Sequence, residues 1–311
     1  MFFSQMTDLF ENEFLVQMII APINPSDLIP ITGAYSHRTV LPSFIGYEGV
    51  GIVKDVGNQQ NSNLLGKRVL LVDVKGTWQE FLKVKRDNII IIPDDIPNII
   101  GAQMYINPLT AWIICKYVLN VKVSNFVAIN ASGSNLGKAL IQINHSLGAN
   151  IIAIVRNNRN IKLLKELGAQ YVVNTENQSV YNEIMRITKN QGVNFAIDSI
   201  GGASGMNLAK SVKKNGNFVA VGLLSNQQVD WKFISENLCI QCGIFHLRHW
   251  MNSNSILEKS QEFNKLFSMV KNNMLQISTH AKIYPIDKFK FAINDSLNED
   301  IKEKIFLRLT D

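Results

Sequence analysis

A regular alternation of apolar runs and amphipathic segments, starting near residue 126, is the feature that most restricts the fold. The apolar runs are rich in β-branched residues and read FVAINA, NIIAIV, QYVV, NFAIDSI and NFVAVG. Between them lie helix-patterned segments: NLGKALIQINHSLG, NIKLLKELG, VYNEIMRITKN and GMNLAKSVKKNG. Parallel strands need such crossovers, and both faces of their sheet are then covered. The sequence therefore predicts a doubly wound α/β domain.

The segments on either side of this series have a different texture. The first hundred residues contain short β-type runs such as GVGIVKDVG and KRVLLVDV, separated by turn signals, which favours a small barrel or curled sheet. After about residue 250 come one long helical pattern, SILEKSQEFNKLFSMVKNN, and the strand-like KIFLRL. We expect this tail to complete the first sheet. The predicted domains are 1–106 with 250–311, and 107–249 inserted between them.

Composition excludes several classes of function. The net charge of +6 comes from scattered basic residues, so we expect no nucleic-acid partner, which would need a concentrated basic face. No apolar run approaches the ~20 residues that span a bilayer, and MFFSQMTDLFENEF lacks the positive charge of a secretory signal. Three cysteines are too few for a disulfide framework. We expect a cytoplasmic protein with no membrane partner.

The segment FVAINASGSNLGKALIQI is the candidate dinucleotide-binding turn. A strand runs into small residues and then a helix, so the backbone can approach a pyrophosphate and the helix N–H groups can bind its charge. Ala131, Ser134 and Gly137 occupy the three spaced positions of a G-x-G-x-x-G pattern, with Gly133 inside the turn. A tight strand-to-helix turn with no ligand is the alternative.

Arg156 ends the second strand of the series, IIAIVR. An acidic residue near this position binds the ribose 2′-hydroxyl of NAD, whereas an arginine accommodates the 2′-phosphate of NADP. The predicted cofactor is therefore NADPH. Alternatively, Arg156 only caps the strand in solvent.

Several sequence blocks in register resemble one family. They are APINPSDLIPITGAY, LPSFIGYEGVGIVKDVG, INPLTAW, NASGSNLG, LKELGAQYVVN and KIFLRL. Together they resemble the medium-chain dehydrogenase/reductase superfamily, in its zinc-lacking quinone oxidoreductase and trans-2-enoyl thioester reductase branches. The resemblance implies a Rossmann domain inserted into a GroES-like, mostly β catalytic domain, NADPH as cofactor, and a homodimer formed by edge pairing of the Rossmann sheets.

The resemblance also implies site residues. Tyr35 corresponds to the proposed proton donor, with the alternative that it only stacks on the substrate as a rim residue. The family's cofactor contacts fall on Asn107, Thr110, Gly133, Ser134, Asn135, Leu136, Gly137, Arg156, Asn157, Asn158, Val221, Gly222, Leu223, Leu224, Ile244, Phe245, His246 and Lys304. Asp27 and Glu48 lie in blocks that look structural and are given no catalytic role.

The sequence departs from the family at two places. Much of the opening hairpin is expected to be missing or rebuilt, and Tyr47 of GYEG stands where zinc-dependent members carry a ligand histidine. We expect no metal site. A zinc site of Cys239, Cys242, His246 and His249 is the alternative, but CIQCGIF has the pattern of a buried strand in which cysteine serves as a small apolar residue.

The predicted reaction is NADPH-dependent reduction of a conjugated C=C bond. Hydride would add to the β-carbon of an enoyl thioester of coenzyme A or acyl carrier protein, and Tyr35 would protonate the enolate. The alternatives are a quinone or enone oxidoreductase on the same fold, and a degenerate cofactor-binding protein without turnover.

Overall fold

The chain divides into two compact units in a computed structural model that describes residues 9–32, 42–298 and 300–310. Unit 1 comprises Met1–Ile106, Arg248–Lys271 and Ile277–Asp311, and unit 2 comprises Asn107–Leu247 and Asn272–Gln276. Within the described ranges, no helix has the length and apolar character that crossing a membrane requires.

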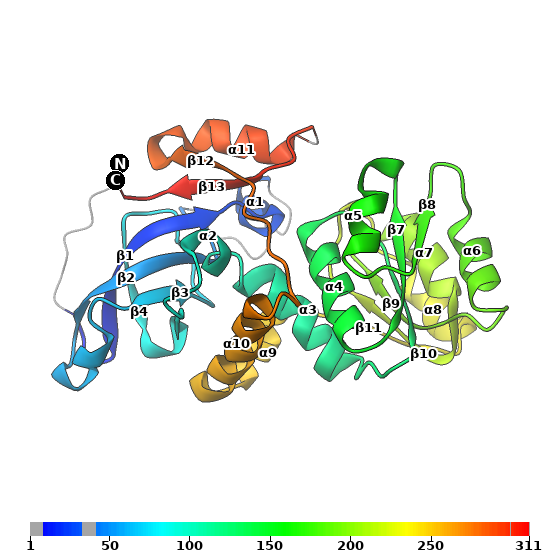
Figure 1. Cartoon of the computed structure of the whole chain (residues 1–311), viewed down its shortest axis with the longest axis horizontal. Helices are drawn as coiled ribbons and strands as arrows, with labels where there is room; N and C mark the ends of the chain where they lie inside the picture. Colours follow the sequence, from blue (N-terminus) through cyan, green and yellow to red (C-terminus); the bar gives the residue numbers. More distant parts are fainter. Residues whose placement is uncertain (1–8, 33–41, 299, 311) are drawn as a thin grey trace. The chain divides into compact units, whose positions relative to one another are not determined.

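Unit 1 is built on a mostly antiparallel sheet (Figure 1). Its strand order is β12-β13-β1-β2-β3-β5, and β4 pairs with β1. The strands are β1 (Glu13–Pro22), β2 (Gly49–Val56), β3 (Arg68–Leu71), β4 (Phe81–Lys85), β5 (Ile89–Ile91), β12 (Ala281–Pro285) and β13 (Lys304–Arg308). The helices are α1 (Pro25–Thr32), α2 (Asn98–Gly101), α10 (Ile256–Lys271) and α11 (Phe289–Leu297), and α9 (Leu247–Ser253) starts at the junction with unit 2.

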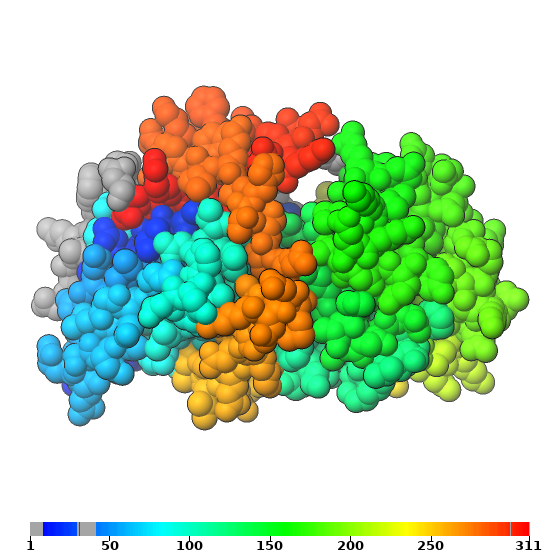
Figure 2. Space-filling view, viewed as in Figure 1, coloured from blue at the N-terminus to red at the C-terminus, as the bar shows by residue number. Residues whose placement is uncertain are grey.

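The late strand β13 completes the early sheet, as predicted from KIFLRL. It pairs antiparallel with β1 in the register Ala21↔Leu307, and the red C-terminal segment accordingly lies over the blue N-terminal strand in Figure 2. Alternate residues of β1 are buried, from Phe14 through Met18, because successive strand side chains point to opposite faces. These side chains pack with Leu71 and Leu307 in one apolar core.

Unit 2 is a six-stranded parallel sheet in the order β11-β10-β9-β6-β7-β8. Its strands are β6 (Phe126–Ile129), β7 (Asn150–Val155), β8 (Tyr171–Asn174), β9 (Val193–Asp198), β10 (Val212–Ala220) and β11 (Gln241–Ile244). Counted from β6, this is the 3-2-1-4-5-6 order of a Rossmann fold, in which ligands bind where the strand order reverses, here between β6 and β9. The doubly wound domain predicted from the alternating pattern is confirmed.

Helices cover both faces of this sheet (Figure 1). The connections are α4 (Asn135–Ser146), α5 (Ile161–Glu166), α6 (Val180–Ile187), α7 (Gly202–Lys210) and α8 (Trp231–Asn237). Apolar residues of α6, α7 and α8 pack on one face, while α4 and α5 lie on the other. One helix is shorter than predicted: α7 ends at Lys210, and Val212 already pairs with Val193, so SVKKNG belongs largely to β10.

Candidate cofactor and catalytic site

The turn after β6 has the shape that a pyrophosphate-binding turn needs. Ala131 takes a positive φ of 47°, and Ser134 caps α4 by accepting a 3.0 Å hydrogen bond from Gly137 N–H. A Cβ on Gly137 would lie 2.6 Å from the carbonyl oxygen of Ala131, so only glycine lets the helix approach the turn this closely. This is the role that the third glycine of the dinucleotide fingerprint performs. The remaining predicted residues here, Asn135 and Leu136, begin the helix.

Ser132 fixes this turn to the neighbouring strand. Its buried hydroxyl donates to Ile129 O at 2.7 Å and accepts from Ile154 N at 3.1 Å. These two bonds tie the turn to β6 and β7 and hold its small residues at the carboxyl edge of the sheet.

The predicted phosphate-discriminating loop adjoins the turn. Arg156 and Asn158 are exposed, and Asn157 caps a short helical turn by accepting from Arg159 N at 3.1 Å. A Cβ on Gly133 would lie 2.7 Å from Asn160 Nδ2, so the turn after β6 and the loop after β7 lie against each other. The structure thus brings the residues predicted after β6 and those predicted after β7 together.

Asn130 and Asp198 link the two halves of the carboxyl edge. Both are buried, and Asn130 Nδ2 donates to Asp198 Oδ1 at 2.5 Å while Asn130 Oδ1 accepts from Ser199 N at 2.8 Å. The Asp198 carboxylate also accepts from the N–H groups of Ile200 and Gly201. Sequence reasoning missed both residues, although a lone aspartate closing the apolar run NFAID was a readable signal.

The predicted residues Val221, Gly222, Leu223 and Leu224 form the adjoining loop after β10. Val221 N–H donates to Asp198 O at 2.7 Å, and Leu224 N–H donates to Ser199 O at 3.1 Å. A Cβ on Gly222 would lie 2.8 Å from Ser199 O, so this glycine is required for the close packing. The loop is therefore positioned by the same segment that Asn130 holds.

Ile244, Phe245 and His246 follow the edge strand β11, where one expectation proves wrong. The strand exists as predicted, and Phe245 N–H donates to Ala220 O at 2.8 Å. However, all four residues of β11 are exposed, as are Cys239 and Cys242, because in the part of the chain that the structure describes β11 has a neighbouring strand on one side only. CIQCGIF is an edge strand rather than a buried one. Among the described residues, no group of three or more His, Cys, Asp or Glu is arranged to hold a metal ion.

Asn107 and Thr110 lie in a helix with two wide turns, at Tyr105–Leu109 and at Ile114–Val118. Such π-helical turns are rare and occur frequently at functional sites. Pro108 lies inside the first of them, where its ring and missing N–H disfavour regular α-helix. Asn107 is half-buried and Thr110 is buried.

A buried polar cluster in unit 1 contains the predicted residue Lys304. Its ammonium donates to Ile23 O at 2.6 Å and to Asn24 Oδ1 at 2.7 Å. Asn24 Nδ2 in turn donates to Glu48 Oε1 at 2.7 Å, and Glu48 Oε2 accepts from Ile106 N at 2.8 Å. Burial lowers the pKa of Lys304 and raises the pKa of Glu48 to about 7. Glu48 thus anchors the backbone directly before Asn107.

Asp27 adds a second buried carboxyl group to this cluster. It accepts from Asn24 N at 2.7 Å and from Tyr47 N at 3.0 Å, and burial raises its pKa to about 6. Burial and the nearby Asp27 charge raise the pKa of the half-buried Tyr47, which keeps that phenol protonated at neutral pH. The predicted proton donor Tyr35 lies outside the described residues.

Comparison with known proteins identifies the family. Residues 11–94 match the alcohol dehydrogenase GroES-like domain and residues 136–272 match the zinc-binding dehydrogenase domain. A mitochondrial enoyl-[acyl-carrier-protein] reductase of Xenopus tropicalis is 30% identical over 309 residues, which is 96% of this chain and 87% of that protein. A Bacillus thuringiensis structure provisionally named an NADPH:quinone reductase is 42% identical, with a TM-score of 0.96 over 98% of this chain and 93% of the other.

The chain belongs to the medium-chain dehydrogenase/reductase superfamily, in its branch of quinone and enoyl reductases. The fold of this branch extends to an Escherichia coli quinone oxidoreductase solved with NADPH. That structure is 21% identical and has a TM-score of 0.88 over 99% of this chain and 94% of its own. At this identity the likeness concerns the fold alone.

Proposed function

We propose that this chain is an NADPH-dependent reductase of a conjugated C=C bond, with a trans-2-enoyl thioester of coenzyme A or acyl carrier protein as substrate. The observation that carries the proposal is the turn at Ala131–Gly137. A Cβ on Gly137 would lie 2.6 Å from backbone atoms of the turn, and the start of the capped helix is suited to bind an anion. Similarity to enoyl-[acyl-carrier-protein] reductases over 95–96% of this chain and 86–87% of those proteins supports the substrate class.

The residues described above fit a phosphorylated dinucleotide. The residues of the turn after β6 would hold the pyrophosphate. The 2′-phosphate would be bound by Arg156, Asn157 and Asn158. The nicotinamide half would be held by Asn107, Thr110, the loop Val221–Leu224 and the segment Ile244–His246. Lys304 would contribute one ammonium donor beyond the two that its partners in unit 1 engage.

NADPH supplies the hydride that adds to the β-carbon of the substrate. The electron pair of the C=C bond then moves into the enolate, and Tyr35 delivers its phenolic proton to the α-carbon. A tyrosine with an ordinary pKa of about 10 is protonated at neutral pH and can donate without special tuning. Solvent then returns a proton to the Tyr35 phenolate.

A quinone or enone reductase on the same fold is the second candidate, and the 42% identical Bacillus thuringiensis structure favours it. The test is NADPH oxidation by the purified chain with crotonyl-CoA and, separately, with a naphthoquinone. Turnover with crotonyl-CoA alone supports the enoyl reductase, and turnover with naphthoquinone alone supports the second candidate. Binding of NADPH without oxidation by either acceptor would overturn both.

A homodimer and a cytoplasmic location complete the proposal. Edge pairing through β11 is supported by the exposure of all four of its residues, since an open strand edge is a template for pairing. The curated relatives are mitochondrial enzymes of eukaryotes, and subcellular fractionation of the source cell would test the location.

A further inference from the structure

Asn174, the last residue of β8, is a buried amide whose orientation is fixed by the backbone around it. Its side chain is 3% exposed, and its Oδ1 accepts a 2.9 Å hydrogen bond from Glu176 N–H. A backbone N–H can only donate, so the atom facing Glu176 must be the oxygen. The other end of the amide, Nδ2, therefore has to be the donor in whatever contact it makes.

That donor is directed at Asn158 in the loop after β7. Asn174 Nδ2 lies 2.8 Å from Asn158 Oδ1, and Val155↔Asn174 is the terminal pair of the two strands. Because Asn158 must offer its oxygen to Asn174, its own NH₂ group is turned away. Asn158 is exposed, so the loop presents a hydrogen-bond donor, and not an acceptor, beside Arg156.

We propose that Asn174 is a positioning residue that sets the preference of this site for a 2′-phosphorylated dinucleotide by fixing the amide orientation of Asn158. The inference rests on the proposed function. A 2′-phosphate offers only acceptor oxygens, which match an outward NH₂. NAD-preferring sites instead place an acceptor at the 2′-hydroxyl. If the Asn158 amide were turned over, its oxygen would face outward and would suit the 2′-hydroxyl of NADH instead of the 2′-phosphate of NADPH.

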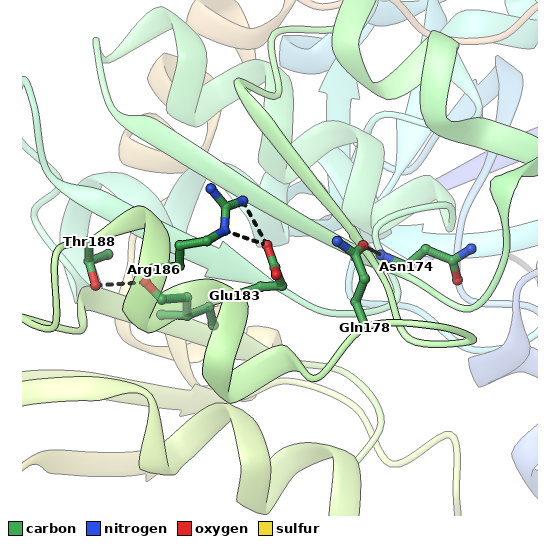
Figure 3. Close-up of polar contacts among 6 residues, drawn as sticks. Asn174, Gln178, Glu183, Arg186 and Thr188 are labelled. Carbon is green, nitrogen blue, oxygen red and sulfur yellow. Dashed lines mark hydrogen bonds and ion pairs between the residues drawn. The ribbon is translucent and has the colours of Figure 1, made fainter.

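Gln178 supplies a control on the same strand end. Its Oε1 accepts from Asn174 N at 2.9 Å, and Figure 3 shows it reaching the Asn174 backbone while the Asn174 side chain points the other way. Gln178→Glu keeps an acceptor oxygen for that N–H and adds one negative charge without touching the Asn158 amide. Because the Gln178 side chain is exposed, Gln178→Glu is expected to fold normally.

The experiment measures the dissociation constants of NADPH and NADH for the wild type, Asn174→Asp and Gln178→Glu. In Asn174→Asp the second carboxylate oxygen needs a donor, so Asn158 turns its NH₂ inward and its oxygen outward. The expected result is a roughly 10- to 100-fold fall in the NADPH preference, with NADH binding more tightly than to the wild type. Gln178→Glu is expected to retain nearly the wild-type preference.

A second, uncharged variant, Asn174→Ser, keeps the test usable if the buried carboxylate prevents Asn174→Asp from folding. A serine hydroxyl can still accept from Glu176 N–H but does not extend to Asn158, so the NADPH preference is expected to fall without a gain for NADH. Equal falls in Asn174→Asp and Gln178→Glu, or an unchanged preference in both Asn174 variants, would overturn the inference. Absence of NADPH binding to the wild type would instead overturn the proposed function, and the inference with it.

Discussion

Asn130 donates a 2.5 Å hydrogen bond to Asp198 across the point where the strand order of unit 2 reverses. The pair joins the last residue before the β6 turn to the last residue of β9. The backbone carbonyl of Asp198 also accepts from Val221 N–H, which connects this pair to the loop after β10. Three loops at the carboxyl edge are thereby held by the Asn130 amide, the Asp198 carboxylate and the Asp198 backbone carbonyl.

Asn130→Asp should destabilise the protein strongly. It places two carboxylates within a hydrogen-bond distance in a buried site, where unpaired charges cost roughly 3–5 kcal/mol. The free energy of unfolding, measured by denaturant titration, should fall by that order and recover partly as the pH falls, since one carboxyl group then takes up a proton. The double variant Asn130→Asp with Asp198→Asn removes the repulsion between the two carboxylates and should regain part of the loss. It should not regain all of it, because the atom of Asp198 that faces Asn130 also accepts from Ile200 N–H, which an amide NH₂ cannot do. Wild-type stability of the single variant would contradict this role.

Gly137→Ala should cost more stability than Gly133→Ala. The added methyl group at 137 meets backbone atoms of Ala131 and Ser132 at 2.6 Å, whereas at 133 it meets only the movable end of Asn160. Overpacking against backbone costs about 1–3 kcal/mol, and we expect less than about 1 kcal/mol at 133. Denaturant titration gives both values, and calorimetry should show weaker NADPH binding to Gly137→Ala. Equal effects at both positions would argue against the close helix approach.

Stability should decline as the pH rises from about 4 to about 7, in part through Glu48. Burial raises its pKa from an ordinary 4.5 to about 7, so the folded protein binds more protons than the unfolded chain in this window. Asp27 acts in the same direction, with a pKa of about 6, while the lowered pKa of Lys304 acts oppositely at alkaline pH. Glu48→Gln should flatten the slope of unfolding free energy against pH. The control is Glu236→Gln, at an exposed position, which should keep the wild-type slope. If Glu48→Gln also kept that slope, Glu48 would not be the source of the pH dependence.

Cys242→Lys should yield monomers if the protein is a dimer. A charged side chain on an edge strand is a common device against strand pairing, and Cys242 lies in the middle of exposed β11. Sedimentation velocity should show a dimer for the wild type and a monomer for the variant. A wild-type monomer would exclude the proposed assembly outright.

Tyr35→Phe should lower kcat by roughly 10²–10⁴-fold while the dissociation constant of NADPH stays nearly constant, since general acid catalysis contributes that factor. Tyr47→Phe is the matched variant because the hydrogen bond to Asp27 comes from the Tyr47 backbone N–H, which the substitution leaves in place. If kcat fell in Tyr47→Phe and not in Tyr35→Phe, the proton would come from Tyr47.

The sequence predicted the architecture well because each apolar run is a local signal. NIIAIV and QYVV are the strands β7 and β8, and KIFLRL joins the sheet of the first hundred residues. The exposure of β11 was not predictable, since an apolar run does not tell whether a strand lies at the centre or the edge of a sheet. Likewise, SVKKNG has a helical pattern, but pairing of Val212 with Val193 decides its structure.

The candidate site was predictable only where it is local. The turn from Ala131 to Gly137 is continuous in sequence, so its small residues could be recognised. Asn24, Glu48 and Lys304 are far apart along the chain, and nothing in their own neighbourhoods indicates that they share hydrogen bonds. Asn174 was missed for a similar reason, because its effect passes through Asn158 on another strand.

The pairing of β1 with β13 has a consequence for how the protein reaches its native state in the cell. Ile20–Pro22 emerges early from the ribosome, but its partner Phe306–Arg308 is translated after all of unit 2. Contacts so distant in sequence are slow to form, and domains generally fold as units during synthesis. The Rossmann unit can therefore fold first. Until β13 is made, the Ile20–Pro22 end of β1 lacks its partner strand and is open to premature association with other nascent chains, whereas Glu13–Gln17 already pairs with β4.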